Sequence, residues 1–111
     1  MIAPNQHSVR VWLYRRPTDM RKSYHGLSAL AKHVLNEDPL SGALFVFINR
    51  RRTQLKCLYF DCDGYFIWAK RLERGLFQVS WSDDAKCSLH ARALQYLIDG
   101  IDLKNVPQLT R

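Results

Sequence analysis

The sequence is short of carboxylates, and this shortage argues against a metal-dependent catalytic site. Of the 111 residues, 10 are Asp or Glu, and Glu37 and Glu73 are the two glutamates. A metal-dependent nuclease or polynucleotide transferase needs several carboxylates that converge on two metal ions. The aspartates instead occur mostly in segments typical of turns and helix caps. We therefore expect no catalytic residues, and a nuclease is the weakest of the functions considered.

Three cysteines are too few and too scattered to build a zinc site. Cys57 and Cys62 are close in sequence, but Cys87 is distant, and no second pair of cysteines or histidines completes a ligand set. Asp61 and Asp63 flank an Asp-Gly turn, and turn chemistry explains both without a metal ion. We expect neither metal nor cofactor, and small thiols that stay reduced in a cytoplasm.

Long apolar runs, targeting signals and phosphate-binding loops are missing too. No apolar run approaches the roughly 20 residues of a membrane span, and residues 1–5 lack the basic head and apolar stretch of a secretory signal. There is no Gly-rich phosphate loop and no Gly-x-Ser-x-Gly segment. The sequence thus predicts a cytoplasmic protein, away from membranes.

The chain has instead an excess of positive charge and enough apolar residues for a core. It contains 17 Lys and Arg, carries a formal net charge of +7, and is 47% hydrophobic. A small domain this basic is a candidate for contact with nucleic acid. The length fits one domain spanning residues 1–111, with its core at about residues 9–102.

The N-terminal third predicts a strand followed by one long helix. Val9–Tyr14 alternates apolar residues as a half-buried strand does. Thr18 or Asp19 suits a helix N-cap, and apolar residues then recur at three- and four-residue steps as far as Leu35. We therefore expect a helix over Asp19–Leu35, packed on one face of a sheet.

Three strand-like runs dominate the middle of the chain, at Ala43–Ile48, Leu55–Phe60 and Tyr65–Lys70. Short polar turns separate them, and the second turn contains Asp63-Gly64. An antiparallel meander is the simplest arrangement. The strands are apolar on both faces, so a C-terminal helix, another subunit or a bound partner should cover the second face. A homo-oligomer is therefore an open possibility.

The last third predicts a fourth meander strand at Leu76–Trp81, a short strand at Lys86–Leu89 that pairs back, and a helix over Ala91–Asp99. Together the elements indicate an α+β fold. We expect an antiparallel β-meander with one long N-terminal helix packed on the sheet and a short C-terminal helix.

Basic residues gather in three segments of the chain. The first joins the opening strand to the helix, the second is the turn after Ile48, and the third is the end of the strand Tyr65–Lys70. In a meander the last two share one edge of the sheet, where guanidinium groups could bind phosphates. The candidate nucleic-acid-binding residues are Arg50, Arg51, Arg52, Lys70, Arg71, Arg74, Arg21 and Lys22.

Two features modify this candidate site. Glu73 lies inside the basic run and would repel phosphate, so we expect it to pair with Arg71 or Arg74, which makes the Arg50–Arg52 turn the better DNA contact. Trp68, Tyr59 and Tyr65 could stack on bases, although a place in the core is the alternative for each aromatic ring.

Two blocks, Thr18-Asp19-Met20-Arg21-Lys22 and Lys70-Arg71-Leu72-Glu73-Arg74-Gly75, give the sequence a family resemblance. With smaller matches up to Gly100-Ile101-Asp102, the chain resembles the small accessory protein, often called TnpB, of bacterial insertion sequences of the IS sixty-six family. The resemblance spans about Val9 to Asp102. It implies an element-encoded protein that helps transposition beside a separate, larger transposase, and it supplies no catalytic residues. It also implies a place in the bacterial cytoplasm, associated with the nucleoid when the protein binds DNA.

Two functions follow from the charge and the resemblance together. One is a non-catalytic, basic DNA-binding factor that acts on the phosphate backbone beside the transposase. The alternative is a protein-interaction module that docks on the transposase or on a sibling accessory protein without direct DNA contact. In that case the basic face would meet an acidic partner.

Overall fold

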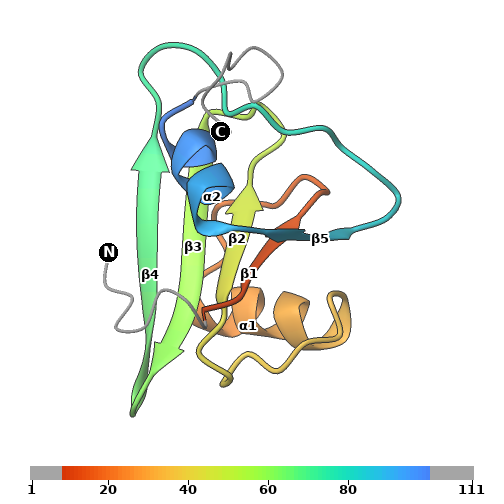
Figure 1. Ribbon diagram of the computed structural model, residues 1–111, viewed down its shortest axis with the longest axis vertical. Coiled ribbons are helices and arrows are strands. Elements are labelled where there is room, and N and C mark those ends of the chain that lie inside the picture. The colour runs from red at the N-terminus through yellow and green to blue at the C-terminus, as the bar shows by residue number, and fades with distance from the viewer. Residues whose placement is uncertain (1–8, 101–111) are drawn as a thin grey trace.

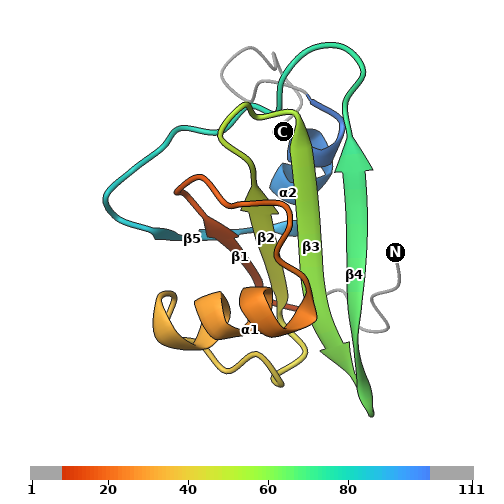
Figure 2. The same cartoon turned by 180° about the vertical axis from the view of Figure 1, so that it is seen from behind.

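The computed structural model describes residues 9–100, which form one five-stranded sheet in the order β4-β3-β2-β1-β5 with a helix on each face (Figures 1 and 2). Residues 101 and 102 of the expected core lie outside the described part. The elements are β1 Val11–Tyr14, α1 Tyr24–His33, β2 Leu44–Ile48, β3 Gln54–Asp61, β4 Gly64–Arg71, β5 Lys86–Leu89 and α2 Ala91–Ile98.

The predicted all-antiparallel sheet is wrong, because β1 pairs with β2 in parallel. Val11 lies opposite Leu44 and Leu13 opposite Val46. Parallel neighbours need a crossover of a dozen or more residues, usually helical, and the segment that contains α1 supplies it. The sheet is therefore mixed. Its first strand lies inside the sheet, between β2 and β5, where a local sequence pattern could not place it.

The three central strands do form the predicted antiparallel meander. Phe45 pairs with Leu58 across β2 and β3, and Leu58 pairs with Ile67 across β3 and β4. In the β3–β4 hairpin, Cys62 has the positive φ of 56°, whereas Gly64 begins β4. The turn is thus where the sequence predicted it, and its left-handed residue is Cys62, not the glycine of the Asp63-Gly64 pair.

The predicted long N-terminal helix, Asp19–Leu35, is also wrong, because α1 has only ten residues, Tyr24–His33. The carboxylate of Asp19 accepts a hydrogen bond from the Arg21 backbone N–H at 2.9 Å, and the Lys22 N–H donates to the Asp19 carbonyl at 3.1 Å. Asp19 therefore organises a separate turn before the helix. Ser23 is the N-cap, and its side chain makes no capping hydrogen bond.

The expected fourth meander strand at Leu76–Trp81 is absent, and these residues cross one end of the sheet without pairing as a strand. Phe77 and Val79 still turn into the core, which explains the strand-like alternation in the sequence. The short strand at Lys86–Leu89 is confirmed as β5, but it pairs antiparallel with β1 instead of pairing back on a fourth meander strand. The C-terminal helix is confirmed as α2, and its N-cap side chain, His90, accepts from the Ala93 N–H at 3.2 Å.

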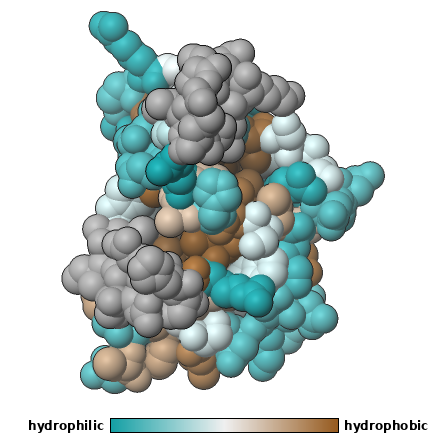
Figure 3. Space-filling view, in the orientation of Figure 1, coloured by the Kyte–Doolittle hydropathy of each residue, from teal (hydrophilic) through white to brown (hydrophobic). Residues whose placement is uncertain are grey.

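Each face of the sheet has its own apolar core, which accounts for strands that are apolar on both sides. On one face Leu27 and Ala31 of α1 pack against Phe45, Phe47 and Leu58. On the other face Phe77, Val79 and three residues of α2 pack against the sheet; the α2 residues are Leu94, Leu97 and Ile98. Seen from the α2 side, hydrophobic residues occupy the middle of this face and hydrophilic residues its margins (Figure 3). The chain itself thus contributes cover to both faces, and self-association stays a prediction.

Candidate nucleic-acid interface

The strand directions bring the basic segments to one end of the sheet. β1, β2 and β4 all end there and β3 begins there, as the arrowheads in Figure 1 show. Gln54 at the start of β3 pairs with Arg71 at the end of β4, and the Thr18 N–H donates to the Ile48 carbonyl at 2.9 Å. We call this region the basic end. It comprises Arg15, Arg16, Arg21, Lys22, Arg50, Arg51, Arg52, Lys70, Arg71 and Arg74.

The β2–β3 turn that carries Arg50–Arg52 is held by the side chain of Asn49. The side-chain amide oxygen of Asn49, Oδ1, accepts from the backbone N–H groups of Thr53 and Gln54, both at 2.9 Å. Arg52 adopts a positive φ of 61°, and its Nη1 points to the Val79 carbonyl at 3.5 Å. Arg50 and Arg51 are exposed, and within the described residues neither forms an ion pair or side-chain hydrogen bond. The turn thus presents two available guanidinium groups from a fixed backbone.

The basic segment at the end of β4, Lys70 to Arg74, lies beside this turn. Backbone N–H groups of Leu72 and Phe77 donate to the carbonyls of Thr53 and Arg52, at 2.8 and 2.7 Å. The sequence prediction that the two segments share an edge of the sheet is therefore confirmed.

The three basic side chains of the Lys70–Arg74 segment differ in whether they are already engaged by a partner in the protein. Lys70 Nζ donates to the Ile98 carbonyl at 2.9 Å and so ties β4 to the end of α2. Arg71 Nε pairs with Glu73 at 3.1 Å, as the sequence predicted for this glutamate. Arg74 is exposed and has no partner within residues 9–100. It is the most available cation of the segment.

Arg21 and Lys22, which belong to the segment between β1 and α1, lie on the α1 side of β3. Lys56 Nζ donates to the carbonyls of Met20 and Lys22, both at 2.8 Å, and so anchors this segment to the sheet. Arg21 donates a hydrogen bond from Nη2 to Oδ2 of Asp19 at 2.6 Å. That hydrogen bond, with the Arg21 backbone N–H and the nearby charge, lowers the pKa of Asp19 from 3.8 to about 2. Arg21 is therefore largely neutralised, whereas Lys22 is exposed.

A shallow hollow of about 480 Å³ lies between Met20, next to Arg21, and the Lys70–Arg74 segment. Met20, Lys56, Lys70, Arg71 and Glu73 contribute to its lining. Lys56 was not among the candidate residues, because a lone lysine in a strand pattern carries no signal of its own. Lys56, Lys70 and Arg71 therefore share one hollow at the basic end.

The three aromatic residues considered for base stacking take the alternative place. Tyr59 and Trp68 pack against the α2-face core, and Tyr65 packs against the α1-face core. Trp81, which was not a candidate, is instead exposed over 36% of its surface. It lines a hollow of about 350 Å³ together with Arg15 and Arg16. Because Phe77, Val79 and Trp81 follow one another at two-residue steps, the sequence pattern would have placed Trp81 in the core with the other two.

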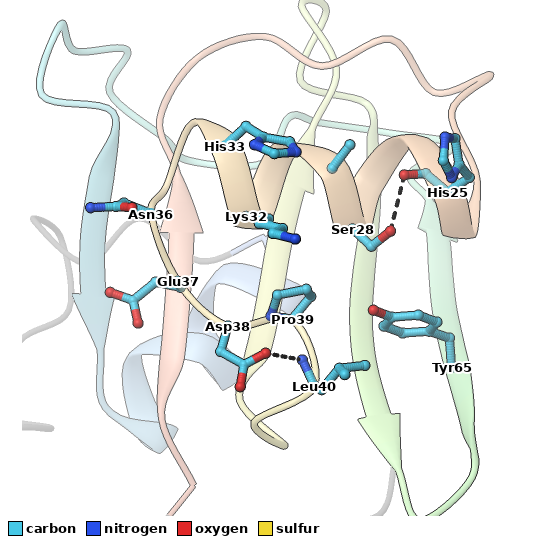
Figure 4. Close-up of a pocket in the computed structure, with 11 residues that line it drawn as sticks. His25, Ser28, Lys32, His33, Asn36, Glu37, Asp38, Pro39, Leu40 and Tyr65 are labelled. Atoms are coloured by element: carbon cyan, nitrogen blue, oxygen red, sulfur yellow. Dashed lines mark hydrogen bonds between the residues drawn. The ribbon is translucent and has the colours of Figure 1, made fainter.

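A further hollow, of about 590 Å³, lies between α1 and the loop that follows it (Figure 4). His25 and His33 both line it, but Figure 4 shows them toward opposite ends of the helix, so they do not converge. Across residues 9–100 no three His, Cys, Asp or Glu side chains are grouped as metal ligands are. Nor does any described helix have the length and apolar character needed to cross a membrane.

Comparisons with known proteins agree with the resemblance seen in the sequence. The family described as "IS66 Orf2 like protein" matches residues 9–108. Uncharacterized protein y4hO of Sinorhizobium fredii is 36% identical over 107 residues, which cover 96% of this chain and 92% of the relative. Uncharacterized protein y4jC of the same organism is 32% identical over 106 residues, covering 96% and 90%. No solved structure matches this chain.

Proposed function

We propose, from the fact that this chain belongs to the family of IS66 Orf2-like proteins, that it is a transposition-associated accessory protein that binds DNA through the basic end. The observation that carries the proposal is the convergence of three basic segments, distant in sequence, at one end of a mixed sheet. Exposure and the absence of a carboxylate partner among the described residues favour four of the candidate residues as phosphate contacts. Arg50, Arg51, Arg74 and Lys22 are exposed and have no carboxylate partner within residues 9–100, so they would contact phosphate first.

The chemistry of this contact is electrostatic. A guanidinium group binds a phosphate through two parallel hydrogen bonds, and each neutralised phosphate releases condensed counterions from the DNA. Contacts to phosphate carry no sequence information by themselves. The chain would therefore bind DNA broadly, and sequence choice would rest with the separate transposase.

The test is the double variant Arg50→Ala/Arg51→Ala, with binding to duplex DNA measured by fluorescence anisotropy over a range of salt concentrations. Arg52 stays in place because it shapes the turn. Loss of two phosphate contacts should make the negative slope of log affinity against log salt shallower by about 2, and it should weaken binding roughly 10- to 100-fold at about 0.1 M salt. The loss should be equal for insertion-sequence ends and for unrelated DNA.

The matched control is Arg10→Ala/Lys32→Ala, which also removes two positive charges. Both residues are exposed, and both lie away from the basic end, Arg10 before β1 and Lys32 in the last turn of α1. If the two variants change the salt slope equally, net charge alone explains binding and the proposed interface is wrong. An unchanged slope in a folded Arg50→Ala/Arg51→Ala variant would instead favour docking of the basic end on an acidic partner protein.

A further inference from the structure

Trp81 has an exposed ring on a segment whose backbone is fixed on both sides. Before it, Phe77 and Val79 are buried, and the Phe77 N–H donates to the Arg52 carbonyl at 2.7 Å. After it, the Ser82 N–H donates to the Arg15 carbonyl at 3.0 Å. Burying an indole ring stabilises a fold through its large apolar area. Here Phe77 and Val79 of the same segment are buried in the core, whereas Trp81 keeps 36% of its surface exposed.

Two arginines border the ring. Arg16 donates from Nη2 to the backbone carbonyl of Asp83 at 2.8 Å, and Arg15 donates to the carbonyl of Asp84 at 3.2 and 3.3 Å. Both arginines, Trp81 and Asp83 line the same shallow hollow of about 350 Å³. The bond from Arg16 uses one of its five N–H donors on a neutral acceptor, so its charge remains available. Arg15 makes a longer contact of 3.7 Å with the exposed Asp84 carboxylate.

This combination fits one kind of ligand better than others. A flat, polarisable ring stacks on any nucleobase, and flanking arginines favour the adjacent phosphates. The bases of a continuous duplex are stacked on one another and offer no free face. A base without a pairing partner, as in a single strand or at a frayed end, does offer one.

We infer that Trp81, with Arg15 and Arg16, forms a subsite for an unpaired base of single-stranded DNA. The inference rests on the proposed function, because the phosphate contacts of the basic end would bring the strand to Trp81. It goes further in giving the protein a preference for DNA that is not fully paired.

The test compares Trp81→Ala with the unaltered chain on single-stranded and duplex DNA of one sequence, about 20 nucleotides long, which exceeds the roughly 4–16 nucleotides that one small binding domain covers. Stacking of one base should make single-strand binding by Trp81→Ala roughly 5- to 100-fold weaker. Duplex binding should change by less than about twofold. Trp81→Phe should keep part of the single-strand affinity, because it retains an aromatic face.

Leu76→Ala is the matched control, since Leu76 is an exposed apolar residue of the same segment, and it should leave both affinities unchanged. Equal single-strand affinity for Trp81→Ala and the unaltered chain overturns the inference while salt-dependent duplex binding leaves the proposed function standing. Absence of binding to either form overturns both. Tighter binding of RNA of the same sequence overturns the assignment to DNA.

Discussion

At the scale of single residues, the structure separates cations that are available from cations that are already engaged. Arg21 is bound to Asp19, and Arg71 to Glu73, although the sequence offers both arginines as phosphate ligands. Arg50 and Arg51 are exposed and have no carboxylate partner within residues 9–100. The count of 17 Lys and Arg therefore overstates the number of available cations, and the positions of the carboxylates decide which arginines remain unpaired.

The pair of Asp19 and Arg21 gives a pH prediction. The pKa of Asp19 is lowered from 3.8 to about 2, chiefly by the hydrogen bonds from Arg21. A lowered folded-state pKa stabilises the protein above about pH 4, and this contribution is lost as the pH falls through 2. In Arg21→Ala the pKa of Asp19 should return toward 3.8, as measured by NMR titration of the side-chain carboxyl carbon. The pair is exposed, so the change in overall stability should be small. A carboxyl that still titrates near pH 2 in Arg21→Ala would contradict this account.

At the scale of elements, the loops between strands carry as much of the organisation as the strands themselves. Residues 72–85 pass over one end of the sheet and are tied by backbone hydrogen bonds to the β2–β3 turn and to the end of β1. Lys70 ties β4 to the last turn of α2. A protonated amine at the C-terminal end of a helix also interacts favourably with the negative end of the helix dipole. Lys70, which the sequence predicted as a DNA contact, therefore helps to hold α2 on the sheet.

Lys70→Ala tests that role. The hydrogen bond from the charged amine to the Ile98 carbonyl is partly buried, so its loss should lower the free energy of unfolding by about 1–2 kcal/mol. Arg74→Ala, which changes an exposed residue of the same segment, should stay within about 0.5 kcal/mol of the unaltered chain. Urea denaturation followed by circular dichroism measures both values. If Lys70→Ala keeps full stability but loses as much DNA affinity as Arg50→Ala/Arg51→Ala, the lysine is a phosphate ligand and its tie to α2 is secondary.

At the scale of the whole molecule, one sheet serves two apolar cores. Phe47 is fully buried on the α1 face and contacts Tyr14 edge-on, with ring centroids 5.9 Å apart. Leu55 is fully buried on the α2 face. Both faces belong to the same strands, so neither core should unfold without the other.

Phe47→Ala and Leu55→Ala test this coupling. The first should cost about 3–5 kcal/mol and the second about 2–5 kcal/mol, because each leaves a cavity in a closely packed core. In both variants, circular dichroism of the backbone and tryptophan fluorescence should report one coincident unfolding transition. A transition seen by one probe well before the other would show that the two faces unfold separately.

The amino-acid sequence by itself determined the local features of this protein. The β-branched and aromatic runs specified β2, β3 and β4 and their hairpin order, because neighbouring strands joined by short turns pair with each other. The sequence also predicted the C-terminal helix, an ion pair between Glu73 and one of two neighbouring arginines, and the family; the structure shows that the partner of Glu73 is Arg71. The start of α1 could not be predicted from the sequence. The carboxylate and the carbonyl of Asp19 accept hydrogen bonds from Arg21 and Lys22 in a separate turn, so Asp19 does not cap α1.

Only the tertiary structure decided the partner of β1, and with it the composition of the basic end. The alternation of Val9–Tyr14 states that a strand forms but not which strand it joins, since that choice depends on how α1 crosses the sheet and on which faces are left to cover. The exposure of Trp81 and the engagement of Lys70 have the same origin. Both follow from contacts between residues far apart in sequence, Trp81 beside Arg15 and Arg16 and Lys70 at the carbonyl of Ile98, and periodicity along the chain carries no record of such contacts.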